Sequence, residues 1–112
     1  MGPRLMTLLC MVALAPLVWA GDTATVTVPE KAYAVLERIL ERNGEPPPGH
    51  VGGRVFHNRE RRLPRGRYRE YDVNPRVRGK DRGPERIVID RDTGQAWYTA
   101  DHYRTFVLME RP

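Results

Sequence analysis

The sequence predicts an α+β domain in which one N-terminal helix packs on a curved antiparallel sheet of about five strands. Residues 29–42 carry apolar side chains at helical spacing. After residue 53 the chain consists of short β-branched or aromatic runs separated by turn residues. Because the helical segment precedes all of the strands, we expect it to cover one face of a single sheet. The other face is then left for function.

The first twenty residues have the features of a secretory signal peptide. A single charge at Arg4 precedes an apolar stretch from Leu5 to Trp19, and a small-residue cleavage site ends at Ala20. The stretch contains Pro16 and is short for a membrane-spanning helix, which needs roughly 20 apolar residues. We therefore expect a signal peptide at residues 1–20 and a single domain at residues 21–112. The mature protein is expected to be secreted, either to the periplasm or outside the cell, and not to be held in a membrane.

Composition suggests a polyanionic partner for the mature chain. Removal of the signal, which includes Arg4, leaves eighteen Lys and Arg against fourteen Asp and Glu, a net charge of +4. The only cysteine, Cys10, lies in the same segment, so no disulfide is expected. A basic secreted domain favours nucleic acid or another polyanion as its partner. Solubility and adhesion to a cell wall are alternative reasons for the charge.

The predicted helix is amphipathic, with Pro29 near its first turn and Asn43 and Gly44 as its stop signal. Its apolar stripe is expected to face the sheet, and we assign the helix no chemistry. The members of the stripe are Tyr33, Leu36, Ile39 and Leu40. The following segment, "NGEPPPGHVGG" at residues 43–53, is rich in proline and glycine and is predicted to be a connector.

Five short runs after the connector are predicted to be strands. Turn residues separate them, notably "RDTGQ" at residues 91–95, so consecutive runs should pair in an antiparallel manner. The predicted strands are residues 54–56, 68–73, 86–90, 96–99 and 105–109.

Four polar residues stand at or near strand ends and together could split an RNA phosphodiester without a metal. RNA carries its own nucleophile, the 2′-OH, so the reaction needs a base for that proton and an acid for the departing 5′ oxygen. Glu70 is the candidate base and His102 the candidate acid. Arg82 and Arg86 could stabilise the charge that develops on the phosphorus oxygens. Taken singly, each of these residues is common on protein surfaces.

Four segments, taken in order, resemble the bacterial guanyl-specific ribonucleases of the barnase type. They are "GRVFHNRERRLP", "YREYDV", "RGPERIV" and "YTADHYRTF", which correspond to that family's guanine-binding loop, base-bearing strand, arginine pair and histidine turn. The resemblance implies the microbial ribonuclease fold, with Glu70 as general base, His102 as general acid, and Arg82 and Arg86 as a phosphate clamp. The implied reaction forms a 2′,3′-cyclic phosphate, which is then hydrolysed to a 3′-phosphate.

The resemblance also implies how guanine is recognised. In the loop "FHNRE", backbone amides would bind the O6 atom of guanine, and Glu60 would accept hydrogen bonds from N1 and the exocyclic amine. Leaving such a carboxylate buried without its donors would cost about 1–3 kcal/mol or more, which would disfavour adenine. His57, Asn58 and Arg59 share this loop, and Tyr103 is expected to flank the base or the phosphate.

The implied partners are an RNA substrate and an acidic, barstar-like intracellular inhibitor that protects the producing cell, with the enzyme itself a monomer. No cofactor is expected. The histidines, His50, His57 and His102, are scattered along the chain without metal-ligand spacing, so no metal site is predicted.

Several alternatives stay open at the level of sequence. The ring of His57 could stack on the base, obstruct it or face solvent, and Arg76 and Arg78 compete for the phosphate clamp. A basic secreted module that binds nucleic acid without cutting it would use the arginines of residues 59–69 for phosphates, with an affinity that falls as salt is added. Adhesion to an acidic envelope is less favoured because the chain has no basic amphipathic helix.

Overall fold

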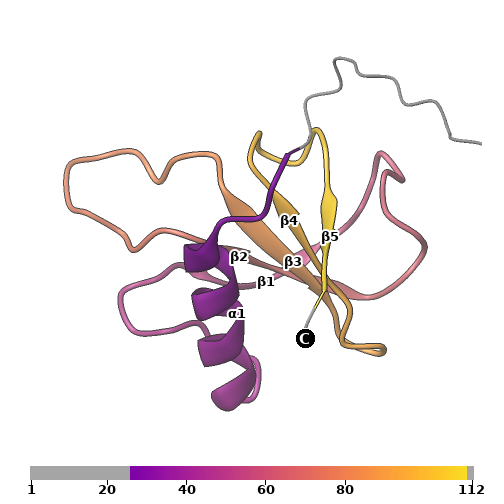
Figure 1. Cartoon of the computed structure of the whole chain (residues 1–112), viewed down its shortest axis with the longest axis horizontal. Helices are drawn as coiled ribbons and strands as arrows, with labels where there is room; N and C mark the ends of the chain where they lie inside the picture. The colour runs from indigo at the N-terminus through magenta and orange to yellow at the C-terminus, as the bar shows by residue number, and fades with distance from the viewer. Residues whose placement is uncertain (1–25, 111–112) are drawn as a thin grey trace, which may run out of the picture.

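The computed structural model describes residues 26–110, and the predicted α+β fold is confirmed. One helix precedes a five-stranded sheet whose neighbouring strands are all antiparallel and follow one another in chain order (Figure 1). The elements are α1 (Glu30–Glu41), β1 (Gly52–Phe56), β2 (Tyr68–Asp72), β3 (Arg86–Asp90), β4 (Ala96–Thr99) and β5 (Val107–Met109). The expected signal peptide lies outside the described residues. None of the helices in residues 26–110 combines the length and the apolar character needed to cross a membrane.

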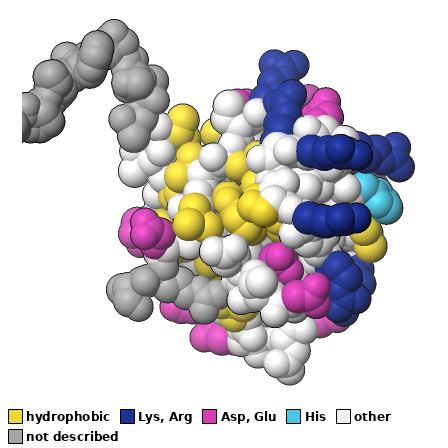
Figure 2. All heavy atoms as spheres, turned by 90° about the vertical axis from the view of Figure 1, so that its right-hand side faces the viewer, with side chains coloured by type: hydrophobic (Ala, Val, Ile, Leu, Met, Phe, Trp, Pro, Cys, Tyr) yellow, Lys and Arg dark blue, Asp and Glu magenta, His cyan; other side chains and the backbone are white. Residues whose placement is uncertain are grey.

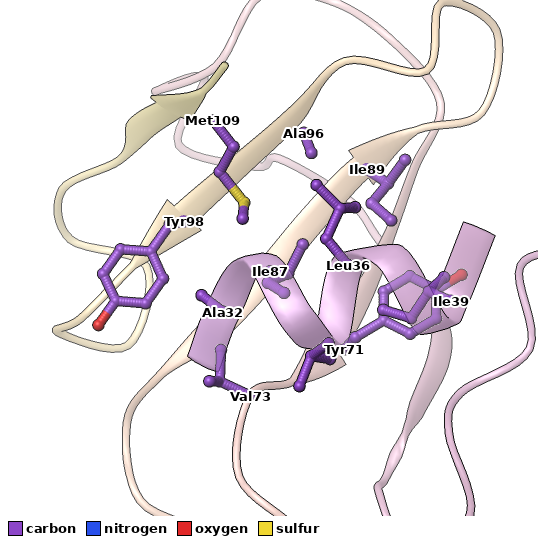
Figure 3. Close-up of a cluster of buried hydrophobic side chains, with 11 residues drawn as sticks. Ala32, Leu36, Ile39, Tyr71, Val73, Ile87, Ile89, Ala96, Tyr98 and Met109 are labelled. Carbon is purple, nitrogen blue, oxygen red and sulfur yellow. The ribbon is translucent and has the colours of Figure 1, made fainter. Parts of the chain in front are cut away.

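Helix α1 covers one face of the sheet and builds the main core. Its buried side chains meet alternate residues of the strands, among them Tyr71, Ile87 and Tyr98 (Figure 3). The predicted stripe was partly wrong. Leu36 and Ile39 are buried, but Tyr33 is only half-buried and Leu40 is 38% exposed. The buried stripe is instead Ala32, Val35, Leu36 and Ile39, which keeps the helical spacing but turns the helix so that small Ala32 lies at the sheet.

The opposite face of the sheet carries a second, smaller apolar cluster. Because successive side chains on a strand alternate between faces, β2 directs Tyr71 toward α1 and directs Tyr68, Glu70 and Asp72 to this second face. The cluster contains Leu63, Tyr68, Val88 and Trp97, with Phe56, Tyr103 and Phe106 packed against it. It anchors the loop of residues 57–67 and the turn of residues 100–106 above the sheet.

Three strand boundaries differ from the predicted ones. Strand β2 ends at Asp72, one residue earlier than predicted. Strand β1 begins at Gly52, two residues earlier, with an irregularity in register between Gly52 and Arg54. A Cβ atom at Gly52 would lie 2.7 Å from the Tyr71 ring, so only glycine allows this close pairing of β1 with β2. Strand β5 begins at Val107 and not at Thr105, because the backbone and hydroxyl of Thr105 hydrogen-bond to Asp101 in the preceding turn.

The Glu85 carboxylate joins α1 to the sheet. It accepts hydrogen bonds from the amine of Lys31 at 2.8 Å, from the Asn74 amide at 3.0 Å and from the Tyr98 hydroxyl at 2.5 Å. Burial disfavours the charge on Glu85, but these hydrogen bonds outweigh burial and lower its pKa from 4.5 to about 2. The ionised carboxylate therefore stabilises the folded state next to the first residues of β3.

Replacement Glu85→Gln should lower the free energy of unfolding by about 1–3 kcal/mol near neutral pH. A carboxyl whose pKa is lowered by folding stabilises the protein above its unfolded pKa, and this contribution is lost as pH falls. The difference between wild type and variant should therefore shrink between about pH 5 and pH 2, as measured by urea unfolding. A difference that stayed constant over this range would contradict the assigned role of the charge.

Candidate active site

A pocket of about 410 Å³ lies on the sheet face opposite α1. Its walls come from the end of β1, the loop of residues 57–67, the middle of β2 and the turn after β4. The lining residues are Val55, Phe56, His57, Asn58, Arg59, Glu60, Arg62, Glu70, His102, Tyr103 and Phe106. Seven residues singled out from the sequence, separated by up to 46 positions, therefore line one pocket: His57, Asn58, Arg59, Glu60, Glu70, His102 and Tyr103.

Glu70 has a fixed position in the middle of the sheet. It lies on β2 and is paired with Arg54 of β1 on one side and with Val88 of β3 on the other. Its side chain is half-buried and lines the pocket. A carboxylate held by two neighbouring strands does not depend on a loop for its placement.

Arg82 and Arg86 are brought together by a buried carboxylate that the sequence analysis gave no role, that of Asp72. The Nε and Nη2 atoms of Arg82 donate to its two oxygens at 2.7 and 2.8 Å. The Nε of Arg86 lies 3.0 Å from Oδ1 as an ion pair without a well-directed hydrogen bond. The Nη1 of Arg86 donates to the carbonyls of Gly83 and Glu85. The two guanidiniums thus share one counter-charge and are held rigidly beside it.

Tyr103 connects this ion cluster to the pocket. Burial, followed by the charge of Glu70, raises the pKa of Tyr103 above its usual value, and the Arg86 guanidinium opposes that effect only in part. The phenol therefore stays protonated and lies against both Glu70 and Arg86. Its ring stacks on Phe56, with ring centroids 4.9 Å apart and an interplanar angle of 25°. Arg82 also interacts electrostatically with Glu70, which completes the connection between the arginines and the pocket.

The turn that carries His102 is built around Asp101. Its Oδ1 accepts hydrogen bonds from the backbone N–H of Arg104 and Thr105, at 3.1 and 2.9 Å. Burial disfavours the Asp101 charge, but these bonds and others from Thr105 and Thr99 lower its pKa to about 2. The charged carboxylate thereby organises the backbone of the turn.

His102 and Tyr103 both have left-handed backbone conformations, with φ of 56° and 75°. Two successive non-glycine residues in this region are strained, so the surrounding hydrogen bonds must hold them there. The His102 N–H donates to the Pro84 carbonyl at 3.1 Å, and the Tyr103 N–H donates to Thr99 Oγ1 at 3.0 Å. The exposed imidazole is thereby placed at the pocket, with its ring centroid 4.8 Å from that of Tyr103.

The side chain of Asn58 holds the loop after β1 in its shape. Asn58 has φ of 52°, and its amide exchanges two hydrogen bonds with the backbone of Leu63, at 2.9 and 3.1 Å. Its side chain is therefore engaged in shaping the loop. His57 is exposed at the rim of the pocket, as in the solvent-facing alternative.

Glu60 differs from the expectation, because its side chain is 70% exposed and not buried. In the protein without a bound base, the Glu60 carboxylate is therefore solvated and has no free-energy cost of burial. Arg62, which also lines the pocket, lies 3.5 Å from the Glu60 carboxylate and donates to the carbonyl of Arg104 in the histidine turn. Arg62 thus links the two loops that form the pocket.

The competing arginines lie elsewhere. Arg76 and Arg78 line a separate depression together with His50 and Lys80, whereas Arg82 and Arg86 share Asp72 and interact with the residues of the pocket. Sequence reasoning missed Asp72 and Asp101, and it considered Arg62 only as a phosphate contact of the nucleic-acid-binding alternative. Asp72 could have been found, because it stands two residues after Glu70 on the same strand and therefore on the same face.

Comparison with known proteins identifies the family of this chain. A family model described as ribonuclease matches residues 20–110. The chain is 44% identical to guanyl-specific ribonuclease St of Saccharopolyspora erythraea over 79% of this chain and 92% of that protein. It is 36% identical to guanyl-specific ribonuclease Sa of Kitasatospora aureofaciens over 82% of this chain and 96% of that protein. The chain belongs to the family of bacterial guanyl-specific ribonucleases.

A solved relative of this ribonuclease has been seen with a nucleotide bound. The crystal structure of ribonuclease Sa2 with guanosine-2′-cyclophosphate is similar with a TM-score of 0.57 and 36% identity, over 74% of this chain and 87% of that one. Within residues 26–110 of the present ribonuclease, no group of three or more His, Asp or Glu side chains is arranged to hold a metal ion.

The Asp72 cluster can be tested by stability. Replacement Asp72→Asn would leave Arg86, which is 4% exposed, without its counter-charge, and we expect the free energy of unfolding to fall by about 3–5 kcal/mol. Asp92→Asn is the matched control, because Asp92 pairs with Arg67 at 2.8 Å on the exposed surface. Denaturant unfolding of both variants should show a much smaller loss for the control. Equal losses would contradict a special role for the buried cluster.

Proposed function

We propose that this ribonuclease is a guanyl-preferring endoribonuclease that cleaves single-stranded RNA. The observation that carries the proposal is that Glu70, His102 and the loop containing Glu60 line one pocket, with Arg82 and Arg86 held beside it by Asp72. A base, an acid, cationic groups and a base-recognition loop are thus within one site. The relatives named guanyl-specific ribonucleases support the same activity.

In the first step, Glu70 takes the proton of the 2′-OH, and the 2′ oxygen attacks the adjacent phosphorus. The bond from phosphorus to the 5′ oxygen of the next nucleotide breaks, and His102 in its protonated form donates a proton to that oxygen. The products are a 2′,3′-cyclic phosphate and a free 5′-OH. In the second step the roles reverse. His102 removes a proton from water, the resulting hydroxide opens the cyclic ester, and Glu70 returns a proton to the 2′ oxygen to leave a 3′-phosphate.

Arg82 and Arg86 would stabilise the negative charge on the five-coordinate phosphorus. Asp72 occupies two of the five N–H groups of Arg82, so the others remain available for phosphate oxygens. Because Asp72 already fixes both guanidiniums, little reorganisation is needed when charge develops, and such preorganised donors are the most effective kind. The phenol of Tyr103, which lies against Glu70 and Arg86, would donate to the same phosphate.

Guanine would be recognised at the loop of residues 56–60, the recognition loop. Glu60 would accept hydrogen bonds from N1 and the exocyclic amine, and the backbone amides of the loop would donate to O6. Adenine lacks this pair of donors and presents an amine where guanine has O6. The Glu60 carboxylate is exposed before the base binds, and binding would bury it. A base without the matching donors would leave this carboxylate buried and unpaired in the complex, which lowers its affinity.

The first experiment is cleavage of guanylyl-uridine and adenylyl-uridine dinucleotides in the presence of a chelator, followed by formation of the cyclic phosphate. Wild-type protein should cleave the guanylyl substrate, and Glu70→Gln and His102→Ala should each lower kcat by about 10²–10⁴-fold. Glu60→Gln should raise KM for the guanylyl substrate and reduce the preference for guanine. Folding of each variant is checked by circular dichroism.

The outcomes separate the alternatives. Equal cleavage of both dinucleotides by wild type would remove the guanine preference and keep the catalytic mechanism. A folded wild-type protein that binds RNA but cleaves neither substrate would instead favour the basic nucleic-acid-binding module. Full activity in Glu70→Gln or His102→Ala would show that these residues do not have the assigned roles.

We further propose that the enzyme is secreted and that its producing cell makes an acidic, barstar-like inhibitor. The basic side chains around the pocket support a partner of opposite charge, since complementary charges accelerate association. Co-purification of an acidic intracellular protein on immobilised Glu70→Gln enzyme, with binding that weakens as salt rises, is the expected result. An N-terminus at residue 21 in enzyme recovered from the medium would support secretion, and retention of residues 1–20 would oppose it.

A further inference from the structure

A second pocket lies on the other side of the recognition loop, and nothing in the reaction above uses it. Its volume is about 470 Å³, and its lining residues are His57, Asn58, Arg61, Leu63, Arg65 and Gly66. His57 and Asn58 also line the first pocket, so the recognition loop is the wall between the two. A ligand that extends past this loop from the first pocket would reach Arg61 and Arg65.

The charged groups of the second pocket lack internal partners. Among residues 26–110, Arg61 and Arg65 have no carboxylate within ion-pair distance, whereas nearby Arg62 and Arg67 pair with Glu60 and Asp92. Both side chains are exposed. The neighbouring carboxylate of Asp90 lies beside Gly66 but is only 5% exposed, and its Oδ1 accepts from the backbone of residues 92 and 93. The pocket is therefore positive.

The backbone of Arg61 is a second, independent observation. Its φ is 55°, a left-handed conformation that glycine or asparagine adopts more easily than arginine. The Arg61 N–H donates to the Asn58 carbonyl at 2.9 Å and closes a turn that glycine could form at lower cost. An arginine at this strained position suggests that its side chain has a use, since strain is common at functional sites.

Together these features determine the kind of ligand. Two guanidiniums without carboxylate partners suit a phosphate group, which they can bind through several N–H donors. Figure 2, which views the molecule from the right-hand side of Figure 1, shows several Lys and Arg side chains along one side of that face, with a histidine among them. An RNA chain lying across this face carries phosphates at regular spacing, and the nearest ones beyond the recognised guanosine are the natural occupants.

We propose that Arg61 and Arg65 form a phosphate subsite for RNA outside the scissile bond. The subsite binds a phosphodiester next to the recognised guanosine and favours oligonucleotides over dinucleotides. The assignment rests on the proposed function, because guanine in the first pocket positions the chain. Phosphates on the 5′ and 3′ sides of the guanosine have the same chemistry, and the experiment distinguishes them.

The test is a binding measurement that needs no catalysis. Fluorescent oligonucleotides containing one 2′-deoxyguanosine, which lacks the attacking hydroxyl, are extended by uridines on the 5′ side, on the 3′ side or on neither. The dissociation constants are measured by anisotropy for wild type and for Arg61→Gly with Arg65→Gln. Arg61→Gly suits the left-handed backbone, so the loop is expected to keep its shape. Arg76→Gln with Arg78→Gln removes the same charge from the separate depression and is the matched control.

We expect the Arg61→Gly, Arg65→Gln variant to bind one of the two extended oligonucleotides about tenfold more weakly, with the unextended dinucleotide unchanged. The side that loses affinity identifies the phosphate. The slope of log Kd against log salt should fall by about 0.7 for each phosphate contact removed. The control variant should show neither effect.

Unchanged affinity of the Arg61→Gly, Arg65→Gln variant for both extended oligonucleotides would overturn the subsite, and so would two other results. One is an equal loss for the dinucleotide, which would mean that the two arginines act on the guanine site itself. The other is an equal loss in the Arg76→Gln, Arg78→Gln control, which would mean that only the total charge matters. Because binding is measured without turnover, absence of cleavage by wild type would refute the proposed activity and leave this measurement intact.

Discussion

The buried carboxylate of Asp72 is the interaction on which the site depends. It is 1% exposed, lies at the end of β2 and is paired in register with Arg86 at the start of β3. It also binds Arg82, which lies in the loop between these strands. Two guanidiniums near a half-buried glutamate would repel each other strongly without a fixed anion between them. The cluster therefore orders the loop and partly neutralises the arginines. It also fixes the orientation of the guanidiniums, and with it the direction of their remaining N–H groups.

Glu70 and His102 are held in place in two different ways. Glu70 is fixed by strand pairing on both sides, whereas His102 is fixed by a strained turn organised around the ionised Asp101. The site thus combines a β-strand with a turn in which the backbone N–H groups of residues 103–105 are bound by the side chains of Thr99 and Asp101. The Arg62 contact to the Arg104 carbonyl joins that turn to the recognition loop, so the two walls of the pocket are not independent.

Charge is divided between the centre and the rim. At the centre, Arg82 and Arg86 face Asp72 and Glu70, so opposite charges are nearly balanced. The excess positive charge lies on exposed loops, in side chains such as Arg59, Arg61 and Arg65. Such an arrangement attracts a polyanion over a wide surface and leaves the chemistry to a few groups with fixed partners.

The sequence by itself determined the α+β class and the number and order of the strands, because alternation along strands and turn residues are local properties. It also gave seven of the residues that line the pocket, through their chemistry and through the resemblance to a known family. It did not determine which helical residues face the sheet, since Ala32 and Tyr33 differ by one position and only packing selects between them. Nor did it reveal Asp72 as the partner of both arginines, the exposure of Glu60, or the second pocket behind the recognition loop. Those features depend on distances between segments far apart in the chain, and only the folded sheet brings such segments together.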